Sequence, residues 1–581
     1  MSGCLKGQRT GPGYKSPTDA ISGRPETLMY VTCVQPNGLK DQKPDFLATV
    51  DVNPQSDTYC RVISRAVVSH FGDELHHSGW NSCSSCFCDP NKVRDKMICP
   101  ALNSDRIYIF DMSSPKEPKL FKTIENDELY ANKVSSGHTS HCLPSGEVMI
   151  STMGDEKRLN KGSFILLDGK TFNLKSQWNR PEDSVQFGYD FWYQPNHNVM
   201  ISTEWSAPET VRRGFNLDDV RNGLYGHCLH VWNWSSRQYI QKIDLGSDGM
   251  LPLEIRFLHN PNACEGFVGC ALSSTVFRFF KSGDKWEAEK VLSIPTKRVT
   301  NWITDDMPAL ITDILISLDD KYLYLSLWFL GEIRQYDISN TSSPVLVGKC
   351  CFGGILSNNS LVKEVGNTET DSNTERVFVQ QKHIKGGPQM LQLSLDGRRL
   401  YVTNSLYSVW DKQFFPDMVA EGSVDKGVVG GGSRQYIQKI DLGSDGMLPL
   451  EIRFLHNPNA CEDDMPALIT DILISLDDKY LYLSLWFLGE IRQYDISNTS
   501  SPVFVGKCCF GGILSNNSLV KEIGNTETDG NTERVFVQQK HIKGGPQMLQ
   551  LSLDGKRLYV TNSLYSVWDK QFFPDMVAEG S

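Results

Sequence analysis

The chain has 581 residues, of which 40% are hydrophobic and 22% are charged, and its formal net charge is −11. This length exceeds one ordinary compact domain, and the acidic balance argues against a broad nucleic-acid-binding surface. No stretch approaches the roughly 18–20 apolar residues of a membrane span. The first twenty residues also lack the apolar core of a secretory signal. We therefore expect a cytoplasmic protein, with the nucleus or the membrane periphery as alternatives, and thiols in place of a disulfide frame.

Short β-branched and aromatic runs between turn residues predict strands throughout residues 1–423. One group follows a turn and reads VMIST, LYLS or LYVT, at 148–152, 199–203, 323–326 and 400–403. A second group is apolar and often ends near an acidic residue, at 47–52, 106–111, 164–169, 229–234, 276–281 and 333–338. Six such units of about 57 residues, without a long amphipathic helix, predict an all-β fold of the β-propeller type. A β-sandwich array is the alternative.

Part of the chain is a near-identical internal copy. Residues 434–462 repeat 237–265 without a change, and residues 463–581 repeat 305–423 with four substitutions. The copy omits residues 266–304. Such close identity is typical of a recent duplication or of a join between neighbouring related genes, and functional residues are therefore to be sought in the first copy.

The duplication predicts three segments. These are a β-propeller in 1–423, a Gly-rich flexible linker in 424–433 and a partial propeller in 434–581. A seventh strand of the second group would fall near residue 424, where the pattern stops, so the ring in the first segment should be incompletely closed. Unpaired strand edges attract further strands, which either the copy or another protein molecule could supply.

Histidines supply the main candidate site. His76 and His77 are adjacent, His138 and His141 lie three residues apart, and His259 stands alone. Loops from several blades of a propeller converge at one mouth of its channel, and imidazole nitrogens suit copper, zinc, iron and nickel. The spacing alone leaves open both a nitrogen-rich metal site and unrelated surface histidines.

Cysteines supply a second candidate site. Cys83 and Cys86 form a CxxC motif, which fits a redox pair, half of a zinc site or plain loop thiols. Cys60 lies in a strand-like stretch and reads as a buried core thiol.

Several long motifs carry a family resemblance. DELHHSGWNSCSSCF, HTSHCLPSGEVMISTMGD, GYDFWYQPNHNVMISTEW and LPLEIRFLHNP follow one another across the first copy. At these motifs the chain resembles the selenium-binding protein family. The resemblance implies a seven-bladed propeller that uses copper to oxidise methanethiol with dioxygen and water to formaldehyde, hydrogen sulfide and hydrogen peroxide. It places the copper site among His76, His77, His138, His141 and His259.

The same resemblance implies selenium binding at Cys60 and assigns Cys83 and Cys86 to the CxxC motif of the family. The chain departs from the family pattern after Ser423, where a final strand and a tail with His-Glu-x-Arg-Tyr-Pro-Gly-Gly-Asp-Cys would follow. Two hypotheses follow. One is an enzyme acting on a small thiol and dioxygen; the other is a catalytically impaired selenium-binding scaffold that docks proteins at an open propeller edge.

Overall fold

The chain divides into two compact units, Met1–Cys461 and Glu462–Ser581, in a computed structural model. The structure describes residues 11–351, 353–356, 361–365, 378–379, 382–383, 385–421, 427–430, 436–438, 448–454, 469–487, 489–498, 502–509, 536–537, 540–541, 545–552, 554, 556–563 and 569.

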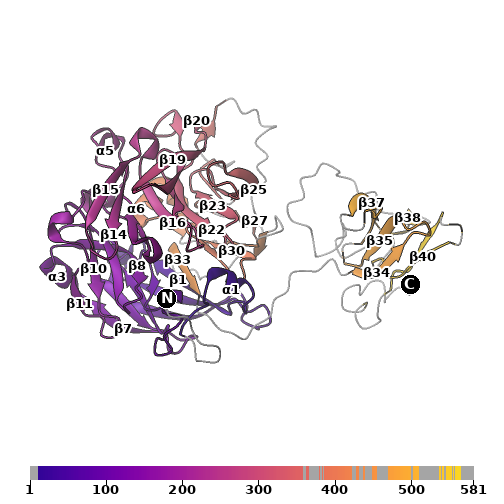
Figure 1. The fold of residues 1–581 in the computed structure, drawn as a ribbon, viewed down its shortest axis with the longest axis horizontal. Coiled ribbons are helices and arrows are strands. Elements are labelled where there is room, and N and C mark those ends of the chain that lie inside the picture. Colours follow the sequence, from indigo (N-terminus) through magenta and orange to yellow (C-terminus); the bar gives the residue numbers. More distant parts are fainter. Residues whose placement is uncertain are drawn as a thin grey trace. The chain divides into compact units, whose positions relative to one another are not determined.

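The first unit contains seven four-stranded antiparallel sheets, which are the blades of a β-propeller (Figure 1). The first blade consists of β33 (Leu448–Phe454), β1 (Leu28–Val34), β2 (Pro44–Asp51) and β3 (Val62–Phe71). The second and third blades consist of β4 (Gly79–Trp80), β5 (Lys96–Pro100), β6 (Ile107–Asp111), β7 (Lys119–Ile124), β8 (Ser135–Cys142), β9 (Val148–Gly154), β10 (Asn160–Leu167) and β11 (Leu174–Gln177).

The next four blades follow in chain order. The fourth and fifth consist of β12 (Phe191–Gln194), β13 (Val199–Ser202), β14 (Cys228–Asn233), β15 (Tyr239–Asp244), β16 (Pro252–Phe257), β17 (Glu265–Cys270), β18 (Thr275–Ser282) and β19 (Lys285–Ser293). The sixth and seventh consist of β22 (Ile311–Ile316), β23 (Tyr322–Leu327), β24 (Glu332–Asp337), β25 (Val345–Cys351), β29 (Leu391–Leu393), β30 (Arg399–Val402), β31 (Gly427–Gly430) and β32 (Tyr436–Gln438). The first-named strands of neighbouring blades contact one another, β12 with β16, β16 with β22, β22 with β29 and β29 with β33, so they are the innermost strands.

The all-β propeller expected from the sequence is confirmed. The four strands of the first sequence group are β9, β13, β23 and β30, each the second strand of its blade. The six strands of the second group are β2, β6, β10, β14, β18 and β24, each the third strand. These strands are apolar because blades pack face to face: Ile107 and Ile109 of β6 share one buried cluster with Val148 and Ile150 of β9.

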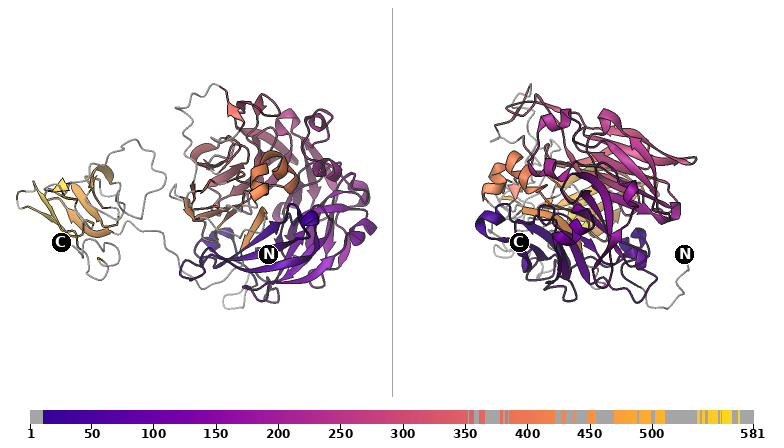
Figure 2. Two further views of the ribbon diagram at one scale, coloured as in Figure 1. Left: turned by 180° about the vertical axis from the view of Figure 1, so that it is seen from behind. Right: turned by 90° about the vertical axis from the view of Figure 1, so that its left-hand side faces the viewer.

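Helices are short and lie outside the blades. They are α1 (Pro17–Ile21), α2 (Gly38–Asp41), α3 (Asn126–Ala131), α4 (Pro208–Arg212), α5 (Leu217–Arg221), α6 (Ser408–Phe414) and α7 (Pro416–Glu421). In the left view of Figure 2, α6 and α7 lie over the centre of the ring. Among the described residues, no helix is long and apolar enough to cross a membrane.

Residues beyond 423 complete both the last and the first blade. β31 lies within the segment expected to be a flexible linker, and it pairs with β30, Leu400 opposite Val429. Two β-branched valines beside an open strand edge favour this pairing over a coil. β33 pairs with β1 from Met29 opposite Phe454 to Val34 opposite Leu448. Residues 1–423 alone therefore leave the ring incompletely closed; the linker supplies β31, and the copy supplies β32 and β33.

The origin of these strands explains why they fit. In the first copy, residues 239–257 include β15, the outermost strand of the fourth blade, and β16, the innermost strand of the fifth. The copied sequence forms β32, again an outermost strand, and β33, again an innermost strand. The same residues thus make the same blade-to-blade crossing, now between the last blade and the first. For this reason the first compact unit extends to Cys461, past the boundaries expected at 423 and 434.

Three small sheets lie outside the blades. They are β20 (Lys297–Thr300) with β21 (Asp306–Met307) and β26 (Lys363–Glu364), then β27 (Phe378–Val379) with β28 (Lys382–His383), and, in the second unit, β38 (Phe536–Val537) with β39 (Lys540–His541).

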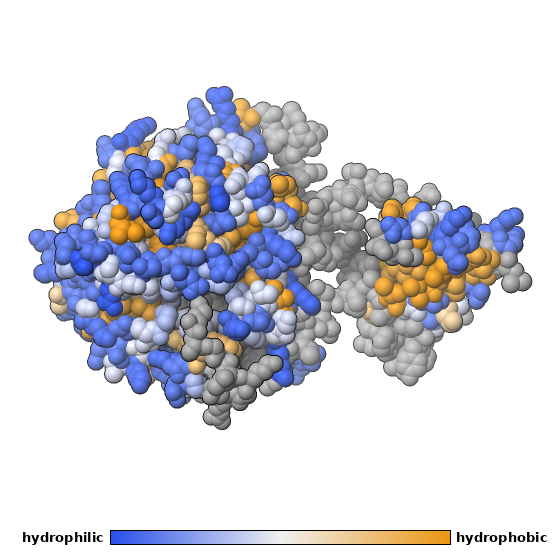
Figure 3. Space-filling view, viewed as in Figure 1, coloured by the Kyte–Doolittle hydropathy of each residue, from blue (hydrophilic) through white to orange (hydrophobic). Residues whose placement is uncertain are grey.

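The second unit keeps one full blade and part of another. Its strands are β34 (Ile469–Ile474), β35 (Tyr480–Leu485), β36 (Glu490–Asp495), β37 (Val503–Cys509), β40 (Leu549–Leu551) and β41 (Leu558–Val560). Ile472 of β34 is 60% exposed, whereas its counterpart Ile314 of β22 is 0% exposed. The difference arises because β22 packs against β16 and β17, and the copy omits residues 266–304. An apolar surface on this unit is visible in Figure 3.

Candidate metal centre

Three of the five predicted histidines meet inside the ring. His76 and His77 directly precede the innermost strand β4, where the backbone N–H of His76 donates to the carbonyl of Pro100 at 3.2 Å. His138 lies on the innermost strand β8 of the next blade. The ring centroids of His77 and His138 are 4.1 Å apart, and that of His76 is 5.1 Å from each. One ring nitrogen of each histidine lies within 4.8 Å of the others. We call these residues the histidine trio.

The histidine trio is buried and at least two of its members are held neutral. His76 is 3% exposed and His138 is 0% exposed. Burial lowers the pKa of both imidazoles well below the ordinary value of 6.5, and the neighbouring imidazoles lower it further. A neutral imidazole keeps a nitrogen lone pair available to a metal ion at neutral pH.

The nitrogens of the trio have the pattern of ligands. Within the described part of the chain, His76 Nδ1 and His138 Nε2 are buried without a hydrogen-bond partner. Buried polar atoms are rarely left unpaired, so such atoms facing one another require an explanation. The other ring nitrogen of His138, Nδ1, lies 3.1 Å from the Thr139 hydroxyl, which fixes the ring as second partners of metal-binding histidines do. The donor set therefore fits a metal ion such as copper.

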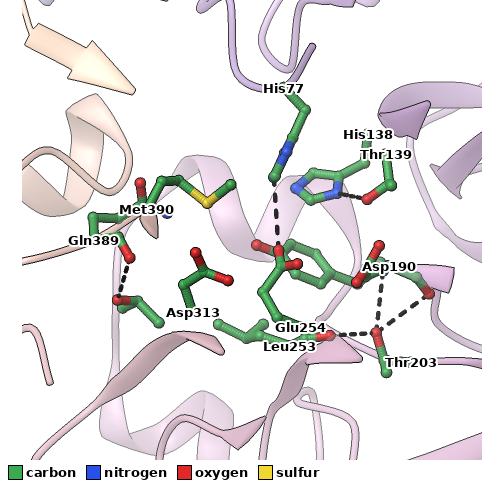
Figure 4. Close-up of polar contacts among 12 residues, drawn as sticks. His77, His138, Thr139, Asp190, Thr203, Leu253, Glu254, Asp313, Gln389 and Met390 are labelled. Carbon is green, nitrogen blue, oxygen red and sulfur yellow. Dashed lines mark hydrogen bonds and ion pairs between the residues drawn. The ribbon is translucent and has the colours of Figure 1, made fainter. Parts of the chain in front are cut away.

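Three buried carboxyl groups, those of Asp190, Glu254 and Asp313, lie near His77 and His138 (Figure 4), and the guanidinium of Arg256 contacts all three. Glu254 lies on β16 and Asp313 on β22, while Asp190 directly precedes β12. Arg256 lies 2.9 Å from Asp190, 2.7 Å from Glu254 and 3.8 Å from Asp313. Glu254 Oε1 lies 3.9 Å from His77 Nε2. When all three acids are ionised they outnumber the one guanidinium, so the buried groups beside the neutral imidazoles then favour a cation.

Glu254 and Asp313 hold their protons more tightly than carboxyl groups usually do. Burial raises the pKa of Glu254 well above its usual value, and nearby Asp190 raises it further although Arg256 opposes the shift. Burial raises the pKa of Asp313 to about 7, again against the effect of Arg256. A carboxyl group with a pKa near 7 can both accept and release a proton at neutral pH.

The other two predicted histidines lie elsewhere. His141 follows His138 by three residues, roughly 10 Å along an extended strand, and its ring packs against Phe191 and Trp192, with centroids 4.9 and 4.7 Å away. His259 follows the end of β16, where its backbone N–H donates to Asp320 and its Nε2 lies 3.3 Å from the carbonyl of Ile316. The expected meeting of five imidazoles is thus limited to three.

The predicted cysteines lie outside the trio. Cys60 is in the core of the first blade, in an apolar cluster with Val31 and Tyr401, and its φ is 57°. Burial raises the pKa of its thiol to about 11. Cys83 precedes the turn of 3-10 helix that follows β4, Ser84–Cys86, and Cys86 is the last residue of that turn.

The segment 405–418 packs beside the histidine trio. The ring of Tyr407 lies 6.1 Å from that of His76, and the backbone N–H of Ser408 donates to the buried Glu74 at 2.9 Å. The ring centroid of Trp410, on α6, is 5.7 Å from that of Trp205. This aromatic cover separates the histidine trio from bulk water on that side.

Sequence reasoning missed Glu254, Asp313 and Arg256. Their signal was present, because LPLEIRF and ITDILI each place charged residues within an otherwise apolar strand. A charge in a fully buried strand must have a partner or a bound ion, so such interruptions mark a functional cavity.

Comparison with known proteins agrees with this architecture. The family model of the 56 kDa selenium binding protein matches residues 8–429 and 460–581. Proteins called methanethiol oxidase are similar: one from Xenopus laevis is 54% identical over 418 residues, covering 71% of this chain and 88% of its own, and one from Homo sapiens is 50% identical over 464 residues, covering 78% and 98%. The crystal structure of a hypothetical selenium-binding protein from Sulfolobus tokodaii aligns with a TM-score of 0.66 and 36% identity, over 76% of this chain and 96% of that one. The chain therefore belongs to the 56 kDa selenium binding protein family.

Proposed function

We propose that the protein is an enzyme that oxidises methanethiol with dioxygen and water to formaldehyde, hydrogen sulfide and hydrogen peroxide, and that it depends on copper. The observation that carries this proposal is the histidine trio, in which His76 Nδ1 and His138 Nε2 are buried without a hydrogen-bond partner among the described residues. The relatives called methanethiol oxidase supply the substrate. The reaction balances, since methanethiol, dioxygen and water together contain the atoms of the three products.

His76, His77 and His138 would hold the copper ion. Bound copper would supply a redox couple and a Lewis acid, which zinc supplies only in part because it does not change oxidation state. Thiols coordinate soft metals as thiolates, so the substrate must lose its proton within the cavity.

The chain itself supplies groups for that proton. Glu254 Oε1 points toward His77, and the pKa of Asp313 is raised to about 7 by burial. We assign these two carboxyl groups to proton transfer and Arg256 to positioning them, since its guanidinium contacts both. Tyr189, whose ring centroid lies 3.9 Å from that of His138, packs on this imidazole and would shield it from water.

The experiment starts from protein stripped of metal and reloaded with copper. Hydrogen peroxide and sulfide should appear when methanethiol is added to the loaded protein, and should be absent for a His76→Ala/His77→Ala variant. A His259→Ala variant is the matched control, because that histidine lies outside the trio, and it should retain activity. If the metal-free protein reacts as fast as the loaded one, the proposal fails.

Selenium binding at Cys60 is a second part of the proposal and is supported by the family. Because burial raises the pKa of Cys60, this thiol is uncharged at neutral pH. A selenium compound would therefore react with Cys60 only after the buried thiol becomes accessible to solvent. Labelling with selenite should be lost in a Cys60→Ser variant and kept in a Cys270→Ser variant, whose thiol is also buried.

A binding scaffold is the second candidate function. It is favoured by the exposed apolar residues of the second unit, which include Ile469, Ile472 and Val503. Metal analysis separates the two, because a scaffold would be purified without stoichiometric copper. For either function we place the protein in the cytoplasm, a reducing compartment that suits its many free thiols.

A further inference from the structure

A second group of metal-ligating side chains lies on the outer strands of the fourth blade. His227 directly precedes β14, Cys228 is the first residue of β14, and Asp244 is the last residue of β15. An imidazole nitrogen, a thiol sulfur and a carboxylate oxygen from these residues all lie within 4.8 Å of one another. In the part of the chain that the structure describes, only this group and the histidine trio bring three potential ligands so close together.

Strand pairing brings the three residues together. β14 and β15 are antiparallel, and their register places Cys228 opposite Asp244. Side chains of opposed residues begin only about 4.5–5.5 Å apart. The backbone N–H of Leu245 donates to the carbonyl of His227 at 3.0 Å, which keeps His227 beside the end of β15. The three side chains can therefore reach one ion without a change in the fold.

A buried acid fixes the backbone of two of these residues. Glu204 is 4% exposed, and its Oε2 accepts hydrogen bonds from the N–H groups of His227 and Cys228, each at 2.9 Å. Its Oε1 lies 2.8 Å from Nε2 of His230, which holds the acid in place. Such outer partners commonly orient the residues that bind a metal ion.

The distance between the imidazole and the carboxylate fits two ligands of one ion. His227 Nε2 lies 3.4 Å from Asp244 Oδ1. This separation exceeds that of the usual hydrogen bond, roughly 2.7–3.2 Å. Zinc binds nitrogen and carboxylate oxygen at about 2.0–2.2 Å, so two such ligands at a tetrahedral angle lie about 3.4 Å apart.

The group is open to solvent on one side and buried on the other. Cys228 is 1% exposed, whereas the side chains of His227 and Asp244 are 40% and 60% exposed. An ion can therefore arrive from solvent and bind inward to the sulfur. The charges near Cys228 include those of Glu204, Asp244 and Lys242. When both acids are ionised they outnumber the one ammonium group, so the surroundings then favour a cation.

We propose that His227, Cys228 and Asp244 bind a zinc ion. Imidazole nitrogen, thiolate sulfur and carboxylate oxygen are the three kinds of zinc ligand in proteins, and three protein ligands leave a fourth position for water. The site is separate from the histidine trio, because it lies on the third and fourth strands of its blade and contains a sulfur. Zinc binding here does not require the proposed oxidase activity.

The first test uses the unaltered full chain, stripped of metal and titrated with cobalt(II) as a coloured substitute for zinc. A sulfur-to-cobalt charge-transfer band should appear in the near ultraviolet, which the histidine trio cannot produce because it has no sulfur. Added zinc should remove the band, since zinc binds such sites more tightly than cobalt. The band should be lost in a Cys228→Ser variant and kept in a Cys270→Ser variant, whose thiol is also buried.

The exposed ligands give variants that should fold normally. Asp244→Asn and His227→Ala should each weaken cobalt binding at least about tenfold, because each removes one ligand. An Asp441→Asn variant is the matched control for Asp244→Asn. It makes the same substitution in the same local sequence, since residues 434–462 repeat 237–265, but the copy contains no counterpart of residues 227 and 228. Its cobalt affinity should equal that of the unaltered chain.

A second measurement identifies the zinc ligands directly. A His76→Ala/His77→Ala variant, which lacks two imidazoles of the trio, should still bind zinc, and X-ray absorption should show one sulfur about 2.3 Å from the ion. Absence of the cobalt band in the unaltered chain, persistence of the band in Cys228→Ser, or equal affinities of Asp244→Asn and Asp441→Asn would each overturn the proposal. Zinc bound at this site in a protein that produces no peroxide from methanethiol would refute the oxidase alone.

Discussion

Closure of the ring by the copied strand β33 can be tested by two truncations. A chain ending at Gln438 keeps β31 and β32 but lacks β33, whereas a chain ending at Cys461 keeps all three strands. β33 and β1 share six residue pairs. At a net contribution of about 1 kcal/mol for each backbone hydrogen bond, the shorter chain should lose about 6 kcal/mol of its free energy of unfolding. The longer one should match the full chain within about 1 kcal/mol, because the second unit is compact by itself.

Equilibrium unfolding in guanidinium chloride measures this difference as a shift in the midpoint between the two truncated chains. A synthetic peptide of residues 445–458 should restore the midpoint of the shorter chain by adding a strand to the open edge of β1, and a scrambled peptide should not. Equal midpoints for the chains ending at Gln438 and Cys461 would refute the role of β33. A large difference between the longer truncation and the full chain would instead show that the second unit stabilises the ring.

Three further outcomes follow from burial and charge. The pKa of His76 and His138 is lowered by burial, so below about pH 6.5 the unfolded chain binds protons that the native chain does not bind. Urea unfolding of the metal-free protein should therefore show its free energy of unfolding falling from pH 7.5 to pH 5.5. For a His138→Gln variant this free energy should fall less steeply. The pKa of Asp313 is raised to about 7 by burial, so the native state favours the protonated form of this side chain. Without metal, an Asp313→Asn variant should therefore become more stable than the wild type as the pH rises from 4 through about 7. The same variant should bind copper more weakly in a titration at pH 8. An Ile314→Asp variant should abolish folding of the ring, because it buries a charge. The matched Ile472→Asp variant in the copy should fold, and light scattering should show that it self-associates less than the unaltered chain. Equal effects of the two substitutions would show that Ile314 and Ile472 are both covered.

Much of the fold could be predicted from the sequence because the second and third strands of each blade are apolar and end at recognisable turns. The left-handed residues at those turns, Asp320 with φ 59° and Gly397 with φ 73°, occupy the SLDDK and SLDGR sequences that precede the LYLS and LYVT strands. The completion of the last blade could not be predicted, since Gly427–Gly430 becomes a strand only because β30 offers it an open edge. A pairing partner far along the chain is a property of the tertiary fold and leaves no local pattern.

The sequence indicated that histidines form the candidate site, but it did not indicate which of the histidines meet. His76, His77 and His138 meet because two innermost strands are neighbours in the ring, whereas His141 is carried past the cavity by the rise of its own strand. Sequence spacing reports neighbours along one segment, and contacts between blades decide the chemistry.

Closing the ring and forming the candidate site place different requirements on the sequence. β33 is a copy of β16, and at the edge of β1 it needs only main-chain donors and acceptors in register, so the residues of one innermost strand can serve at another. The register places Glu451 opposite Thr32, although its counterpart Glu254 belongs to the cavity beside His77. Ring closure thus tolerates a strand copied from another blade, because the main-chain pairing does not require particular side chains at each position. The histidine trio does not depend on that exchange, since its three imidazoles come from the second and third blades, which residues 76–177 build without any contribution from the copy.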